Sequence, residues 1–71
     1  MPDRKIAKRL REARILRGYG TATDAAKALG IPYPTYATYE SGRRGVRTKH
    51  AVRFAGFFNV GIDWLLTGEG A

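Results

Sequence analysis

Apolar positions near the start of the chain recur at the three- and four-residue intervals of a helix that buries one face. Ile6, Leu10 and Ala13 form this stripe, and Arg17 continues it at the same spacing. We expect the helix to begin after Asp3, which can cap its N-terminus, and to end at Gly18. Arg14 follows Leu10 by four residues and lies beside the stripe, so its guanidinium must either reach solvent or pair with a carboxylate.

A short helix is predicted next. Thr21 and Asp24 resemble a capping box before the segment ATDAAKAL, and Gly30 is suited to the left-handed position that ends a helix. The apolar residues that share one face are Ala22, Ala25, Ala26 and Leu29. Side chains this small allow a neighbouring helix to approach closely, so this segment is predicted to pack inside the fold.

The stretch GIPYPTYATYESGRRG follows with almost no linker. A proline holds the residue before it in an extended conformation and is tolerated in the first turn of a helix, so we expect a helix from Pro34 to the residues just before Gly42. Its spacing places Tyr36, Tyr39 and Glu40 on one face, and we expect the two tyrosines to be buried. Two short helices joined by a tight turn form a helix-turn-helix.

Two further helices complete the predicted fold. Thr48 is a candidate cap for a helix whose apolar residues are Ala51, Val52, Phe54, Ala55 and Phe58. A last short helix is expected at about residues 61–67, and residues 68–71 form a tail or the start of a linker to a C-terminal domain. The sequence shows no internal repeat and no β-type alternation. It therefore predicts one all-α domain over residues 1–71, a bundle of about five short helices with the helix-turn-helix at about 21–42.

Charge indicates the kind of partner. Thirteen Lys and Arg residues against six Asp and Glu residues give a formal net charge of +7. The basic residues cluster between Arg4 and Arg17 and between Arg43 and Arg53. Such a chain attracts polyanions, nucleic acid first and anionic membrane second. No apolar run is long enough to span a membrane, and the N-terminus lacks the apolar core of a secretory signal, so we expect a cytoplasmic protein.

An enzyme is not favoured. The chain has no cysteine and a single histidine, His50, which has no nucleophile at a motif spacing. The six acidic residues are dispersed and suggest no acid–base pair. We therefore expect no catalytic residue, no metal and no cofactor.

Several segments together resemble one family. Gly30-Ile31, Thr35-Tyr36 and Tyr39-Glu40-Ser41-Gly42 with Arg43 after them are similar to the second half of the lambda-repressor-like (Cro/C1-type, xenobiotic-response-element) helix-turn-helix. RLREARILRG resembles the first helix of that family and NVGIDWLLTGEG its last helix. The resemblance covers roughly residues 6–70.

The resemblance implies roles for individual residues. It implies an interior ion pair between Arg14 and Glu40, which supplies the carboxylate that Arg14 requires. Base edges in the major groove would be read from the start and outer face of the second motif helix, at Pro32, Tyr33, Pro34, Ala37 and Thr38. Phosphates would be held at the start of the first motif helix and in the turn after the second, by Thr21, Ala22, Thr23, Ser41, Arg43, Arg44 and Arg47. A dimer contact is expected from the C-terminal region, at Phe57, Trp64, Leu65 and Leu66.

Two departures from the family pattern affect specificity. Ala22 stands where the family often has a glutamine that contacts phosphate, so that contact must come from a backbone N–H or from a neighbouring threonine. The second motif helix also lacks the Gln, Asn or Arg side chains that make bidentate base contacts. Pro34 and Ala37 offer apolar surface suited to a thymine methyl group. Specificity should therefore also depend on dimer spacing, DNA shape and the arginines of the following loop.

The function predicted from these observations is a sequence-specific, double-stranded-DNA-binding transcriptional regulator. We expect a phage- or prophage-type repressor that binds a palindromic operator as a homodimer, in the nucleoid of a bacterial or phage-infected cell. Two alternatives remain. One is an antitoxin that represses its own promoter and binds a toxin partner, and the other is a protein-interaction module whose DNA contact is incidental.

Overall fold

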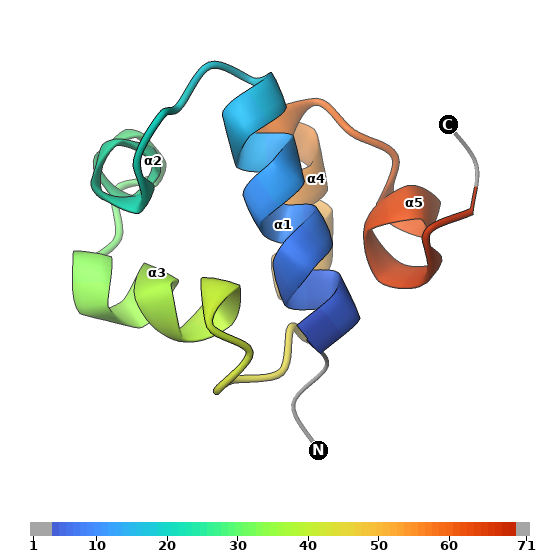
Figure 1. Cartoon of the computed structure of the whole chain (residues 1–71). Coiled ribbons are helices and arrows are strands. Elements are labelled where there is room, and N and C mark those ends of the chain that lie inside the picture. The colour runs from blue at the N-terminus through green and yellow to red at the C-terminus, as the bar shows by residue number, and fades with distance from the viewer. Residues whose placement is uncertain (1–3, 70–71) are drawn as a thin grey trace.

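Five α-helices make up the computed structural model, which describes residues 4–69 (Figure 1). They are α1 (Arg4–Leu16), α2 (Ala22–Leu29), α3 (Tyr33–Glu40), α4 (Thr48–Phe58) and α5 (Ile62–Thr67). No strand occurs in this part of the chain, which confirms the all-α prediction. The proposed Asp3 cap and the last two residues of the expected tail, 70–71, lie outside the described residues.

Helices α1 and α4 form the centre of the molecule. α2 and α3 lie together on one side of them and α5 on the other, as Figure 1 shows. α3 packs against both α1 and α2, whereas α5 packs against α1 and α4. The helix-turn-helix is therefore held against the first helix of the chain, on the side away from α5.

The buried face of α1 differs slightly from the predicted stripe. It comprises Ala7, Leu10, Ala13 and Arg14. Ile6 is only half-buried, and Arg17 is exposed and follows the end of the helix, so its place in the stripe was wrong. Leu10 and Ala13 were identified correctly, and Ala7 completes the face because it lies one turn before Leu10.

The boundaries of the helix-turn-helix follow its caps. The Thr21 hydroxyl oxygen accepts a hydrogen bond from the Asp24 N–H at 3.1 Å, and Gly30 ends α2 in the left-handed region with φ 75°. α3 begins at Tyr33, one residue before the predicted start, with Pro32 as the N-cap and Pro34 inside the first turn. Gly42 then adopts φ 79° in the turn after α3.

Helices α4 and α5 are held by other means than expected. The N-cap of α4 is Arg47 and makes no side-chain hydrogen bond, so the prediction that Thr48 caps this helix was wrong. Thr48 instead lies in the first turn. α5 is only six residues long, and Arg9 of α1 donates hydrogen bonds to its terminal carbonyls, from Nε to Leu65 O at 2.8 Å and from Nη2 to Leu66 O at 3.0 Å.

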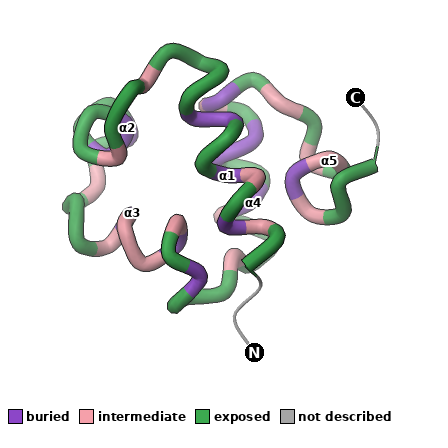
Figure 2. Tube along the Cα trace, in the orientation of Figure 1, coloured by how far each residue is buried: buried purple, intermediate pink, exposed green. Residues whose placement is uncertain are grey.

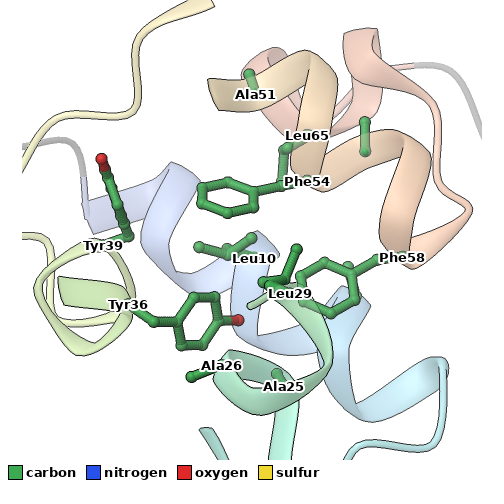
Figure 3. Packing of buried hydrophobic residues seen from close by; sticks show 12 residues of the cluster. Leu10, Ala25, Ala26, Leu29, Tyr36, Tyr39, Ala51, Phe54, Phe58 and Leu65 are labelled. Carbon is green, nitrogen blue, oxygen red and sulfur yellow. The ribbon is translucent and has the colours of Figure 1, made fainter. Parts of the chain in front are cut away.

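All five helices carry both buried and exposed positions (Figure 2). The core contains Leu10 from α1, Ala25 and Ala26 from α2, Tyr36 and Tyr39 from α3, and Phe54 and Phe58 from α4 (Figure 3). The prediction that Tyr36 and Tyr39 are buried is confirmed, since 0% and 4% of their surfaces are exposed. Leu65 is also fully buried, which corrects its assignment to a dimer interface: its side chain fills the core between α1, α4 and α5.

Candidate nucleic-acid interface

The orientation of α3 is fixed by a buried ion pair with α1. Arg14 Nε donates a hydrogen bond to Glu40 Oε2 at 2.9 Å, and the two side chains are only 6% and 11% exposed. Arg14 Nη1 also donates to the Tyr19 carbonyl at 2.7 Å. One guanidinium thus joins the first helix, the loop before α2 and the end of α3. The carboxylate that the position of Arg14 required is present.

The inner face of α3 also carries Tyr36, whose ring packs edge-on against Phe54 at 6.0 Å between centroids. Within residues 4–69 its buried hydroxyl lies near the Glu40 carboxylate but makes no hydrogen bond of good geometry. Burial raises the pKa of the Tyr36 phenol above its usual range, and the nearby Glu40 carboxylate raises it further while Arg14 opposes the change. Tyr36 therefore stays neutral and acts as a packing residue.

The opposite side of α3 faces outward at its N-terminal end. Pro32 and Pro34 are exposed, and Tyr33 is 49% exposed. Ala37 and Thr38 are half-buried. The Thr38 hydroxyl donates to the Thr35 carbonyl at 2.6 Å, so its proton is used within α3. All five predicted base-contacting residues thus retain some exposed surface, and most of that surface is apolar.

The residues predicted to hold phosphate lie at two helix ends. Thr21 and Thr23 are exposed at the start of α2. Because the first N–H groups of a helix have no intrahelical partner, the backbone of Ala22 and Thr23 can donate to an anion there. The Thr21 oxygen already accepts from Asp24, which leaves the hydroxyl proton of Thr21 for a second contact.

The second group lies in the turn after α3. The Ser41 hydroxyl donates to Thr38 O at 3.2 Å and accepts from the Arg43 N–H at 3.4 Å. The Arg44 N–H donates to Thr38 O at 3.1 Å, and its guanidinium lies 5.6 Å from the centre of the Tyr39 ring. The backbone of this turn is therefore fixed against α3, while the Arg43 side chain is exposed.

A hollow of about 390 Å³ adjoins this turn and is lined mainly by basic side chains. Its lining consists of Tyr39, Arg44, Gly45, Arg47, Lys49 and His50. Tyr39 Oη and His50 Nδ1 lie 2.8 Å apart and share a hydrogen bond, which joins α3 to α4. Lys49 was not among the predicted phosphate contacts. The basic run RTKH was the available signal, but the sequence did not reveal that it folds back beside Tyr39.

A helix-turn-helix family model, HTH_3, of the Cro/C1 and xenobiotic-response-element type, matches residues 10–65 of the chain. The chain belongs to this family. Its members are DNA-binding regulators, so this helix-turn-helix protein is a DNA-binding domain of the transcription-regulator class, with α2 and α3 as the motif. No curated protein and no solved structure matched the chain.

Two arginines of the helix-turn-helix protein have structural roles that sequence analysis missed. Arg9 binds the end of α5, and Arg53 Nη2 donates to the Leu29 carbonyl at the end of α2 at 2.6 Å. A cation at the C-terminal end of a helix is favoured by the partial negative charge there. Two of the domain's positive charges, those of Arg9 and Arg53, therefore stabilise helix ends within the fold.

The predicted dimer-contact residues are spread over two environments. Phe57 is half-buried and stacks on Tyr19 at 5.5 Å between centroids, whereas Trp64 and Leu66 are half-buried on α5. A second hollow of about 330 Å³ lies next to Trp64 and is lined by Leu16, Asn59, Val60, Gly61 and Trp64. Leu16 is 79% exposed, the largest exposure among the big apolar residues of the described chain, and was not predicted to take part in a contact.

The described residues contain no group of three or more His, Cys, Asp or Glu side chains arranged to hold a metal ion. None of the helices formed by residues 4–69 has the length and apolar character needed to cross a membrane.

Proposed function

We propose that this helix-turn-helix protein is a sequence-specific transcriptional repressor of the phage or prophage type, which binds a palindromic operator as a dimer. One observation carries the proposal. The inner face of α3 is fixed by the Arg14–Glu40 pair and by two buried tyrosines, while its N-terminal outer face remains exposed. A helix held in this way can enter the major groove without disturbing the core.

The contacts divide into two groups in this proposal. Base edges meet the outer face of α3 through Pro32, Tyr33, Pro34, Ala37 and Thr38. Phosphates meet the start of α2 and the turn after α3 through Thr21, Ala22, Thr23, Ser41, Arg43, Arg44 and Arg47. Phosphate contacts on both sides of a reading helix fix its register along the duplex, and the base contacts then discriminate between sequences.

The dimer would place two copies of α3 about one helical turn (~34 Å) apart on the operator. We assign the contact between subunits to Trp64, Leu66 and Phe57, together with Leu16 at the edge of the same hollow. The exposed Leu16 side chain and the partly exposed Trp64 support this assignment, since isolated exposed apolar residues are ordinary but two around one hollow favour a protein contact.

A selection of bound sequences from random duplex DNA tests the function. We expect one palindromic sequence to be enriched and its affinity to exceed that for random DNA by at least 10³-fold. Affinity should fall steeply with salt, by about 10³–10⁵ between 50 and 200 mM if six to ten phosphates are contacted. No enrichment combined with a shallow salt dependence would contradict the proposal.

The phosphate assignment has its own matched pair of variants. Arg43→Ala should weaken binding to operator and to random DNA about equally and lower the salt slope by about 1. Arg11→Ala removes the same charge from an exposed position on α1, outside the turn, and should leave the slope nearly unchanged. Equal effects of the two substitutions would show that only the net charge matters.

A second candidate function is favoured by the hollow beside Trp64. An antitoxin would use that surface for a toxin partner while the same α3 represses the shared promoter, and a pure interaction module would use it alone. Both repressor and antitoxin act on DNA in the cytoplasm of a bacterial or phage-infected cell. Further chain after Ala71, such as a C-terminal domain, is compatible with each. Retention of operator binding separates the first two functions from an interaction module.

A further inference from the structure

The polar side chains nearest the outer face of α3 are bonded to the backbone of α3 itself. The Thr38 hydroxyl donates to Thr35 O at 2.6 Å, and the Ser41 hydroxyl donates to Thr38 O at 3.2 Å. A hydroxyl group has one proton. While these bonds are made, neither residue can donate a hydrogen bond to a base.

The rest of the outer face offers few polar atoms. α3 has the sequence YPTYATYE and contains no Asn, Gln, Arg or Lys. Thr35 faces a separate hollow toward α4, which it lines with Ile31, Arg53 and Phe54. Tyr33 therefore supplies the one side-chain hydroxyl at the N-terminal end of the outer face that is not bonded to α3. The remaining surface consists of the rings of two prolines, the methyl group of Ala37 and the side-chain carbons of Thr38.

The major groove contains one apolar group in unmodified DNA, the C5-methyl group of thymine. We infer that α3 reads thymine through this methyl group, with Pro34, Ala37 and Thr38 as the contacting residues. The inference rests on the proposed function, since it requires α3 to lie in the major groove. Each methyl group buried against this surface should contribute about fourfold to affinity.

A second consequence concerns modified DNA. 5-Methylcytosine carries a methyl group at the same ring position as thymine but has an amino group in place of the O4 oxygen. Pro34 and Ala37 have no side-chain donor or acceptor with which to distinguish these two groups, and the Thr38 hydroxyl, whose proton is bonded to Thr35 O, can only accept, which the amino group of 5-methylcytosine tolerates. α3 should therefore accept 5-methylcytosine in place of the thymine that it contacts, and it should reject unmodified cytosine.

The test uses the unaltered protein and its selected operator. Each thymine of the half-site is replaced in turn by deoxyuridine, which lacks only the methyl group, and by cytosine and 5-methylcytosine with guanine opposite. At the contacted positions we expect deoxyuridine and cytosine to bind about fourfold more weakly and 5-methylcytosine to stay within twofold of thymine. Deoxyuridine that binds as well as thymine at every position would overturn the inference.

Two isosteric or near-isosteric variants test the role of Thr38. Thr38→Val replaces the hydroxyl by a methyl group, so the affinity and the preference for thymine over deoxyuridine should be retained. Thr38→Ser removes the methyl group and keeps the hydroxyl, so the preference should fall toward 1 at one position. The reverse pattern would show that the hydroxyl reads the base. Melting temperatures of both variants establish that each is folded.

The two levels of the proposal can fail separately. If the selection enriches no sequence, the proposed function fails. If a sequence is enriched but its affinity does not change on removal of any thymine methyl group, the repressor function stands and the inference about methyl groups is wrong.

Discussion

Arg14 contacts two parts of the fold besides its own helix. Its guanidinium binds the Glu40 carboxylate, 26 residues away along the chain, and the Tyr19 carbonyl in the loop before α2. Both charged side chains are almost fully buried. Each charge compensates the other inside the fold, where an unpaired charge would be strongly destabilising. Removing one partner should therefore lower the free energy of unfolding considerably, although the intact pair itself adds little to it.

Arg14→Ala should lower the free energy of unfolding by about 3–5 kcal/mol, because the substitution leaves the Glu40 carboxylate buried without a partner. Arg17→Ala removes an arginine from an exposed position three residues later and should change stability by less than about 0.5 kcal/mol. Urea denaturation followed by Trp64 fluorescence measures both. Similar values for the two variants would mean that the ion pair does not hold α3.

Tyr36 gives a prediction that depends on pH. Burial holds the pKa of its phenol above the usual value of about 10. In the unfolded chain the phenol ionises near pH 10, whereas in the folded protein it keeps its proton. The stability that this difference provides is complete below pH 10 and is lost above it, by about 1.4 kcal/mol for each further pH unit.

Tyr36→Phe should therefore equal or exceed the unaltered protein in stability at pH 7, because it removes a buried hydroxyl that makes no hydrogen bond of good geometry among the described residues. Above pH 10 the variant should lose stability less steeply than the unaltered protein. Unfolding curves for both proteins from pH 7 to pH 11 test this, since titrations common to both cancel in the difference. Parallel curves over the whole range would contradict the prediction.

At the scale of elements, the ends of the helices depend on backbone positions that few residues tolerate. Gly42 has φ 79° in the turn after α3, and a Cβ atom there would lie 3.4 Å from Arg4 Cγ and 3.7 Å from Arg4 Cα. The turn that presents Arg43 is thus packed directly against the start of α1. A Cβ atom at this position would fit in ordinary van der Waals contact, so the cost of a side chain there comes from the positive φ.

Gly42→Ala should destabilise the protein by about 1–3 kcal/mol, from the cost of a left-handed conformation at a residue with a side chain. Gly45→Ala lies in the same loop but has no neighbouring atom within 4 Å, so its effect should be within about 0.5 kcal/mol. Thermal denaturation distinguishes them. If Gly45→Ala lowered the melting temperature more than Gly42→Ala, the conformational freedom of the loop would matter more than the left-handed position of Gly42.

The helices themselves could be predicted from the sequence because their apolar spacing and capping residues agree. The buried face of α5 could not. A helix of six residues has fewer than two turns, so IDWLL does not indicate whether Trp64, Leu65 or Leu66 points inward. The orientation of α5 is set by its packing on α1 and α4 and by the bonds from Arg9 to its carbonyls. These are contacts between distant parts of the chain.

In the candidate interface, too, some features could be predicted from the sequence and others could not. The position of Arg14 beside an apolar stripe predicted a buried partner, and the family resemblance indicated Glu40. The hydrogen bond of Thr38 was beyond sequence reasoning, since a threonine in a helix can either point its hydroxyl outward or bond to a preceding carbonyl. That choice decides whether the residue can donate to a base.

At the scale of the whole molecule, two surfaces lie at opposite ends of α1. The start of α1 touches the turn after α3, and its last residue, Leu16, lines the hollow beside Trp64. A helix of 13 residues is about 20 Å long. A subunit or partner bound at the hollow would therefore leave the turn after α3 free for DNA.

Leu16→Asp should weaken self-association at least tenfold, because it introduces a charge into the proposed contact. Operator binding should weaken in parallel, whereas the salt slope of a single subunit on random DNA should be little changed. Val52→Asp makes the same change at an exposed apolar residue of α4 outside the hollow and should leave association intact. Sedimentation equilibrium measures association. If the two substitutions changed self-association equally, the subunit contact would lie outside the hollow.

The hydrogen bonds from Arg9 to α5 also bear on when the fold can be completed. Arg9 and Leu65 are 56 residues apart, so the carbonyl that Arg9 binds is synthesised long after it. At about 5–20 residues per second the interval is roughly 3–11 s. During that time α1 exists on the ribosome without the helix that covers one of its sides. Its leucine and alanine face is then uncovered on that side, and closure of the bundle must wait for the synthesis of α5.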